Sequence, residues 1–171
     1  MKETSFENFP MRMVAVSNAN GLAIYAVGFY LMSRLGIVWG ALYAGYCIWM
    51  EWRLLSGSCR SCYYFGKRCG FGKGAVSAWI FRTGTSKPLS AKAVSWIDII
   101  PDFLVSLIPL AVGIVLLVRN FSWPVLLLVI LLLLLGSAGT GLVRSQIACK
   151  YCKQREIGCP AEQLFGKTKQ A

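Results

Sequence analysis

The stretch "VLLLVILLLLLG", residues 125–136, contains no polar or charged side chain. It lies inside a longer run, residues 124–143, that carries no charge at all. A helix needs about 20 residues to cross a hydrocarbon core of roughly 30 Å. Because this run reaches that length by itself, it predicts a transmembrane helix, and a membrane protein is the first hypothesis for the chain.

Three further apolar runs extend the pattern, at residues 13–32, 36–50 and 103–118. The first nearly reaches the length of a span, whereas the other two need their flanks, onward to Leu55 and back to Ile97. Hydrophobic residues make up 56% of the 171 residues, and the mean hydropathy is +0.57. A soluble domain of this size could not bury so much apolar surface. We therefore expect an all-helical polytopic membrane protein with four transmembrane helices in two hairpins.

The distribution of basic residues predicts the topology. Of 18 Lys and Arg, only Arg34 and Arg119 lie in the two short connections within the hairpins. Since short loops rich in Lys and Arg stay in the cytoplasm, we expect both termini on the cytoplasmic side of the cell (inner) membrane. The first apolar run follows two acidic residues, so we expect a resident helix there rather than a cleavable signal peptide. This topology also explains the net charge of +11, and we expect the lipid bilayer, not nucleic acid, as partner.

Two segments share the cysteine spacing C-x2-C-x6-C: "CRSCYYFGKRC", residues 59–69, and "CKYCKQREIGC", residues 149–159. Each follows one predicted hairpin by a few residues, so both are expected on the cytoplasmic side. The sequence thus predicts three parts. Residues 1–69 form the first hairpin with its cysteine segment, 70–98 a cytoplasmic surface segment, and 99–171 the second hairpin with its cysteine segment.

The segment 70–98 is expected to contain a short helix at the membrane surface. Its two apolar stretches, "GAVSAWIF" and "AVSWIDII", are separated by "TGTSKP", which breaks a helix. Trp79, Phe81 and Trp96 suit the headgroup level, where amphipathic rings are common.

Small residues on the predicted spans suggest where helices meet. Gly36 and Gly40 form a G-x3-G pair that Ala41 and Gly45 extend, and residues 137 and 141 form a second small pair. Such pairs let helix backbones approach closely in membranes. We expect the two hairpins to pack along these faces, which would bring both cysteine segments together.

Six cysteines in a reducing compartment point to a metal site or a redox dithiol rather than to disulfides. The predicted metal ligands are Cys59, Cys62, Cys69, Cys149, Cys152 and Cys159, while Cys47 stands apart in an apolar run. The chain has no histidine, so ligation by sulfur alone is favoured. Sulfur ligands suit zinc, iron–sulfur clusters or copper(I).

The spacing resembles the binuclear zinc cluster of fungal transcription factors, in which C-x2-C-x6-C occurs twice with basic residues in the gap. The resemblance covers only the cysteine segments. It departs in the linker, which is short in that family and here extends from residue 70 to 148 through two predicted spans. It implies that two such halves can share two metal ions, and it does not extend to DNA binding.

The cofactor stays undecided between an iron–sulfur cluster and zinc. Three cysteines per segment are one short of the four that a closed zinc site or a cubane cluster takes. Two zinc ions could share six thiolates, each segment could hold a cubane with a non-cysteine ligand, or four cysteines could take one metal. Aromatic residues and glycines around the first segment, and Pro160 after Cys159, favour iron–sulfur.

We therefore expect an electron-transfer module with a membrane or cytoplasmic protein partner, rather than a stand-alone enzyme. One alternative is a structural or assembly subunit stapled by zinc. Another is a protein that handles soft metals or uses the cysteines as a dithiol. The sequence is compatible with ligation within one chain or across a homodimer. Asp98 and Asp102, four residues apart at the inner end of the third span, are polar candidates that pairing with Lys92 would also explain.

Overall fold

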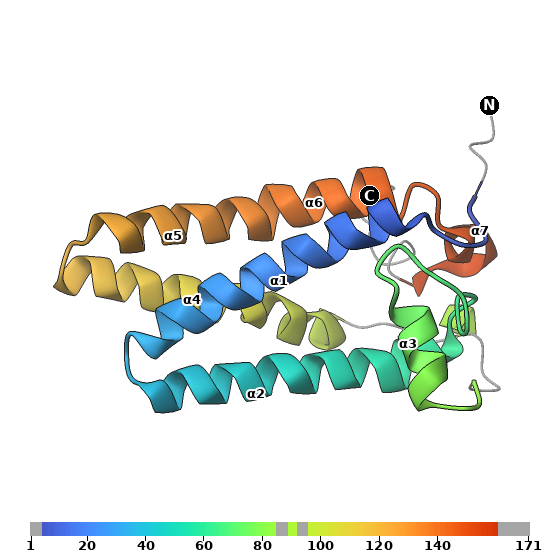
Figure 1. The fold of residues 1–171 in the computed structure, drawn as a ribbon, viewed down its shortest axis with the longest axis horizontal. Coiled ribbons are helices and arrows are strands. Elements are labelled where there is room, and N and C mark those ends of the chain that lie inside the picture. The colour runs from blue at the N-terminus through green and yellow to red at the C-terminus, as the bar shows by residue number, and fades with distance from the viewer. Residues whose placement is uncertain (1–4, 85–88, 92–95, 161–171) are drawn as a thin grey trace. The chain divides into compact units, whose positions relative to one another are not determined.

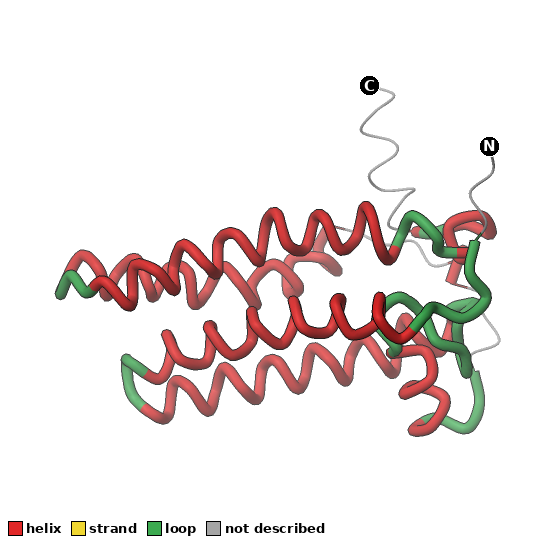
Figure 2. The backbone as a smooth tube through the Cα atoms, turned by 45° about the horizontal axis from the view of Figure 1, so that its top comes forward, coloured by secondary structure: helices red, strands yellow, loops and turns green. Residues whose placement is uncertain are grey.

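The computed structural model describes residues 5–84, 89–91 and 96–160. These residues form helices joined by short loops, and the one extended pairing among them is an isolated parallel bridge between Phe6 and Cys152 (Figures 1 and 2). The predicted all-helical class is confirmed. In chain order the elements are α1 (Met11–Ser33), α2 (Ile37–Arg53), η1 (Leu54–Ser58), η2 (Cys59–Ser61), α3 (Lys73–Ile80), η3 (Leu89–Ala91), α4 (Trp96–Arg119), α5 (Trp123–Leu134), η4 (Leu135–Gly139), α6 (Thr140–Leu142), η5 (Val143–Ala148) and α7 (Lys153–Gly158).

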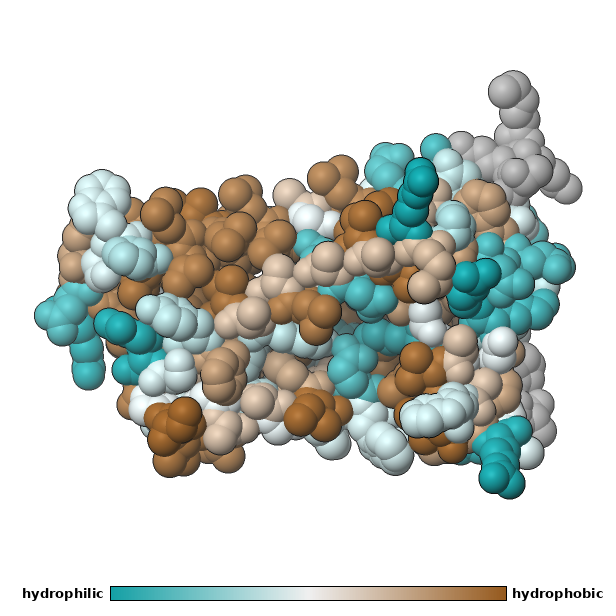
Figure 3. Space-filling model, viewed as in Figure 1, coloured by the Kyte–Doolittle hydropathy of each residue, from teal (hydrophilic) through white to brown (hydrophobic). Residues whose placement is uncertain are grey.

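Within the described residues, three stretches of helix are long and apolar enough to cross a membrane: Met11–Ser33, Asp98–Arg119 and Trp123–Ala148. The last of these runs from α5 through η5, where η4 and η5 are π-helical. Large apolar side chains on these helices are exposed, and brown side chains cover α5 on the face drawn in Figure 3. Exposed leucines along a helix suit a lipid environment, so the chain has the features of a membrane protein.

The chain divides into two compact units. Unit 1 comprises Met1–Ser17, Trp52–Ile99 and Val143–Ala171, and unit 2 comprises Asn18–Glu51 and Ile100–Leu142. Each unit therefore draws on both halves of the chain. The sequence-based division at residues 69 and 98 stays a prediction.

Unit 2 contains most of the four long helices, which pack around one apolar core. The buried members are Ile24, Val27, Leu31, Met32, Tyr43, Cys47, Met50, Val105, Val125, Val129 and Leu132. Cys47 is thus a core residue, as a small apolar side chain would be.

Helix contacts in unit 2 use glycines other than the expected ones. Gly36 lies in the turn before α2, with φ 142°. A Cβ added to Gly45 or Gly141 would have no atom within 4 Å, so neither glycine lies in a close helix contact. Instead, a Cβ on Gly28 of α1 would collide with the Tyr43 ring, and one on Gly113 of α4 with Val129. Spacing alone was a poor guide because it does not say which helix face meets a neighbour. Gly40 lies close to Ser33, in a contact between α1 and α2 rather than in the predicted contact between hairpins.

Pro109 lies inside α4 and removes one of its backbone hydrogen bonds, for which a side chain of α2 substitutes. Because proline has no N–H, the carbonyl of Val105, four residues earlier, loses its helical donor. The Tyr43 hydroxyl of α2 donates to that carbonyl at 2.8 Å. An irregular helix inside a membrane is tolerated where another helix satisfies the freed backbone group in this way.

Unit 1 gathers the N-terminal segment, both cysteine segments, α3 and α7. Its core consists of Phe9, Val14 and Tyr64, with Cys62, Cys69 and Cys152 among the partly buried residues packed against it. The helix predicted within residues 70–98 is present as α3, whereas the Trp96 side chain and Lys92 lie outside the described residues.

Candidate metal centre

The two cysteine segments begin in the same way, although they lie far apart in the sequence. Each is entered through a π-helical stretch, η1 before Cys59 and η5 before Cys149. The N–H of Cys59 donates to the carbonyl of Leu54, and that of Cys149 to Arg144 at 2.8 Å, so both span five residues. Single π-helical turns often occur at functional sites.

The next two backbone hydrogen bonds match as well. The second cysteine donates its N–H to the carbonyl of the first, at 3.4 Å in the first segment and 3.3 Å in the second. The residue three positions later donates to the carbonyl of the second cysteine, at 3.0 and 3.1 Å. The structures then diverge, because the first segment turns at Gly66 (φ 80°) while the second forms α7. The shared part is the C-x2-C turn.

The thiol of the middle cysteine in each segment has a shifted pKa. Burial raises the pKa of Cys62 and of Cys152, to about 11 at Cys152. Backbone N–H groups that follow each cysteine in the sequence lower the pKa in part. The net direction is opposite to the lowered pKa that a reactive dithiol needs. Nearby N–H groups favour the charged form of a thiol.

Tyr64 joins the segments to the N-terminus. Its hydroxyl donates to the carbonyl of Phe6 and accepts from the N–H of Lys153 at 3.0 Å. The side chain is 1% exposed, and burial raises its pKa to about 12. One residue of the first segment thus holds both the N-terminal segment and the start of α7.

Gln154 makes a second direct link. Its Oε1 accepts from the N–H of Tyr63 at 2.8 Å, and its Nε2 donates to the carbonyl of Gly158 at 3.1 Å. The residue is 5% exposed. The buried amide therefore ties the turn after Cys62 to the turn before Cys159.

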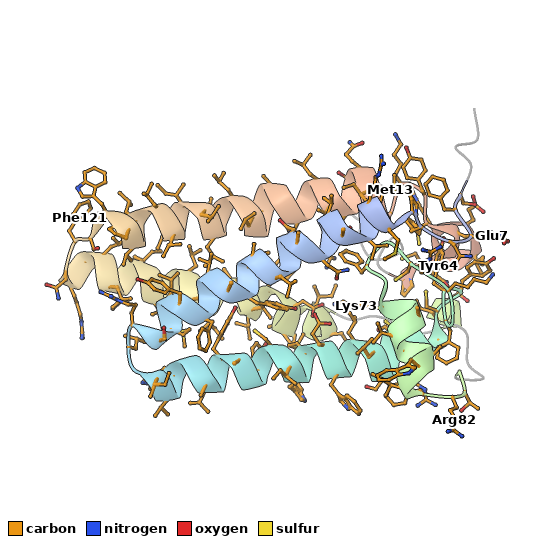
Figure 4. All side chains as sticks on the ribbon, in the orientation of Figure 1. Glu7, Met13, Tyr64, Lys73, Arg82 and Phe121 are labelled. Carbon is orange, nitrogen blue, oxygen red and sulfur yellow. The ribbon has the colours of Figure 1, made fainter. Side chains whose placement is uncertain are left out.

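Aromatic rings from three segments fill the space between these links. The Phe6 centroid lies 5.7 Å from Phe9 and 4.9 Å from Tyr151, and Phe9 lies 5.7 Å from Tyr64. Glu7, which is labelled in Figure 4, pairs with Lys153 at 3.3 Å. The N-terminal segment therefore acts as a wedge between the two cysteine segments.

Five of the six predicted ligands are close enough to affect one another's ionisation. Charge on Cys69 or Cys159 would raise the pKa of Cys62, and charge on Cys62 or Cys149 would raise that of Cys152. Cys59 stands at the start of the same C-x2-C turn. Within the described ranges, no three Cys, Asp, Glu or His side chains are already close enough to hold one metal ion. The metal assignment therefore stays a prediction, while the grouping of the segments is a feature of unit 1.

The basic residues near the cysteines bind aromatic faces and carbonyls. Arg60 donates to the carbonyl of Thr83 at 3.1 Å and lies over the Phe81 ring. Lys67 and Lys153 lie over the ring of Tyr63, at 4.4 and 5.3 Å from its centroid. A role for these cations in offsetting the charge of a thiolate centre stays a prediction.

Two contributors were not expected from the sequence, namely Gln154 and the Phe6–Phe9 segment. The amide of Gln154 carries no pattern that distinguishes it from a surface glutamine. The two phenylalanines could have been noticed, because "FENF" places aromatic rings in an otherwise polar N-terminus.

Comparison of this chain with protein-family models, with curated proteins and with solved structures found no match.

Proposed function

We propose that the chain is an integral membrane protein of four spans whose two cysteine segments together ligate a soft-metal centre at the cytoplasmic face, and that this centre passes electrons. The proposed ligands are Cys59, Cys62, Cys69, Cys149, Cys152 and Cys159. The observation that supports this most is the matched C-x2-C turn in both segments, within one unit and linked by Tyr64 and Gln154.

The donor set fits a soft metal. All six candidates are thiols and the chain has no histidine, which favours iron–sulfur clusters or zinc. Backbone N–H groups near Cys62 and Cys152 would stabilise thiolate charge, and hydrogen bonds to the sulfurs tune the reduction potential of iron–sulfur clusters. Iron–sulfur chemistry would let the site accept and release one electron at a time.

The four-span topology rests on α2 in addition to the three apolar stretches. α2 has 17 residues and continues through the five residues of η1, and together they reach the length of a span. An even number of spans places both termini on one side, and the basic residues favour the cytoplasm. The proposed donor is then a cytoplasmic reductant, and the acceptor is a membrane partner such as a quinone or another subunit.

A structural zinc centre is the second candidate. It is favoured by the density of links between the segments, because Tyr64, Gln154 and the N-terminal wedge already hold unit 1 together. A zinc ion would cross-link the two segments further and would not take part in redox chemistry. The unit would then present a surface to an assembly partner.

Redox titration of protein purified anaerobically in mild detergent distinguishes the two. The electron-transfer proposal predicts iron with inorganic sulfide and a visible absorption band that bleaches reversibly on reduction. Colourless protein that contains zinc and shows no reversible reduction would replace it with the structural candidate. Metal-free protein with six titratable thiols, besides Cys47, would overturn both.

A further inference from the structure

Helix α3 has one buried and one exposed face. Gly74 and Ser77 are buried, whereas Val76, Trp79 and Ile80 are exposed by 46%, 86% and 38%. An indole so exposed on a short helix is unusual in a water-facing surface, since burying a large apolar side chain contributes about 1.5–3 kcal/mol.

The buried face clamps α3 to the first cysteine segment. A Cβ on Gly74 would collide with the carbonyl oxygen of Tyr64, and the Gly74 carbonyl accepts from the N–H of Gly66 at 3.1 Å. Ser77 donates to the carbonyl of Leu55, in η1, at 2.9 Å. Whatever α3 contacts through its other face is therefore coupled mechanically to the turn that carries Cys62.

Contacts within unit 1 relate α3 to the beginning of a membrane stretch. Phe81, just after α3, lies 5.6 Å from the ring of Trp52, in the last turn of α2. The next residue, Arg53, pairs with Asp98 at 3.4 Å. Asp98 is the first residue of the apolar stretch Asp98–Arg119. These contacts link α3 to the residue at which that stretch starts.

We propose that the face formed by Val76, Trp79 and Ile80, together with the Trp52–Phe81 pair, inserts into the headgroup region of a leaflet rich in anionic lipid. Lys73 and Arg82 lie at opposite ends of α3 (Figure 4). An exposed apolar helix face that contains an indole, with cations at the two ends of the helix, matches the interface of an anionic membrane. The contact holds the first cysteine segment at the membrane surface, whichever metal the cysteines bind.

Fluorine NMR of protein labelled with 5-fluorotryptophan, in lipid nanodiscs, tests this. The six tryptophan signals are assigned by single Trp→Phe substitutions. A headgroup-level nitroxide lipid and a water-soluble gadolinium chelate are then added separately. The proposal predicts that the nitroxide lipid broadens the Trp79 signal at least as strongly as that of Trp49 in α2, and that gadolinium broadens it far less.

The charge dependence is measured by comparing discs of phosphatidylcholine with discs that also contain phosphatidylglycerol. Nitroxide broadening of Trp79 should increase with phosphatidylglycerol, and Arg82→Gln should reduce that increase several-fold, while Arg34→Gln leaves it unchanged. A Trp79 signal broadened by gadolinium alone would overturn the proposal. Protection from both reagents would also overturn it, because a protein surface would then cover α3. Metal content is measured on the same samples, so failure here is separate from failure of the metal centre.

Discussion

At the scale of single residues, Tyr64 connects three segments that are remote in sequence. Its hydroxyl both donates and accepts while its ring packs against Phe9, and it follows Cys62 by two positions. The cysteines could be selected from the sequence as candidate ligands because thiols at metal-binding spacing are rare. The linking role of Tyr64 could not be predicted, because its hydroxyl has partners only once Phe6 and Lys153 are brought together.

Replacing Tyr64 with phenylalanine should loosen unit 1. The Phe6 carbonyl and the Lys153 N–H would lose their partner, and an unsatisfied buried group costs about 1–3 kcal/mol. Hydrogen exchange of the Lys153 amide should accelerate by about ten- to a hundredfold, since 1.4 kcal/mol corresponds to a factor of ten. Tyr63→Phe is the matched control, because within the described residues the Tyr63 hydroxyl bonds to side chains, those of the exposed Glu7 and the half-buried Lys67, and not to backbone groups. Equal exchange rates in the two variants would contradict this role of Tyr64.

The same residue gives a pH dependence. Burial raises the pKa of Tyr64 from its ordinary 10.0 to about 12, so the folded state favours the neutral phenol. The stability that this hydroxyl contributes is complete below pH 10 and is lost as the pH rises towards 12. The difference in stability between wild type and Tyr64→Phe should shrink over that interval in thermal unfolding. A constant difference would show that the phenol does not ionise there.

At the scale of elements, hydropathy predicted where helices lie but not which faces touch. Runs of apolar residues specify length, whereas contacts depend on helix rotation, which the fully apolar surface of a span leaves unspecified. The close contacts of α1 with α2 occur at Gly28 and Gly40. Ala41 and Gly45 instead line an open groove with Ile37, Val38 and Leu42.

Gly28→Ala should destabilise unit 2, because the new methyl group would displace the Tyr43 ring. Overpacking of this kind costs about 1–3 kcal/mol. Gly45→Ala, on α2, should cost little, since nothing lies within 4 Å of its Cβ position. The comparison is made by denaturant unfolding in mixed micelles. A greater loss in Gly45→Ala would contradict the assigned packing.

The hydrogen bond that α4 lacks at Pro109 predicts an energetic coupling between Pro109 of α4 and Tyr43 of α2. Tyr43→Phe removes the hydroxyl that serves the Val105 carbonyl and should cost about 0.6–1.7 kcal/mol, as for other hydrogen bonds between membrane helices. In a Pro109→Ala background the helix supplies its own N–H, so the same substitution should cost less. The double-mutant cycle measures the difference. Additive effects would show that Tyr43 does not compensate for the proline.

At the scale of the whole molecule, the repeated order of two helices and a cysteine segment was readable from the sequence. The two units were not, because each takes its residues from both halves of the chain. The sequence did lead us to expect both cysteine segments close together, and unit 1 contains both, but it did not indicate which further segments join them. The backbone match at Cys59 and Cys149 adds support for a duplicated architecture that the cysteine spacing alone suggested.

Four spans and three spans predict different topologies. With four spans, a fluorescent protein fused after residue 171 should fluoresce in the cytoplasm of a bacterial host, as should one fused before residue 1. Alkaline phosphatase inserted in the connection between α4 and α5 should be active outside. Termini on opposite sides would mean that α2 does not cross the membrane.

The central claim is that both cysteine segments build one metal centre. The most direct test is the metal content per chain of wild type, Cys62→Ser, Cys152→Ser and the matched control Cys47→Ser, purified anaerobically side by side. A shared centre predicts that either of the first two substitutions removes most of the metal, because each removes a ligand of the same site, while Cys47→Ser retains it. Retention of half the metal in Cys62→Ser and in Cys152→Ser would mean two independent sites. Wild-type protein without metal would contradict the claim altogether.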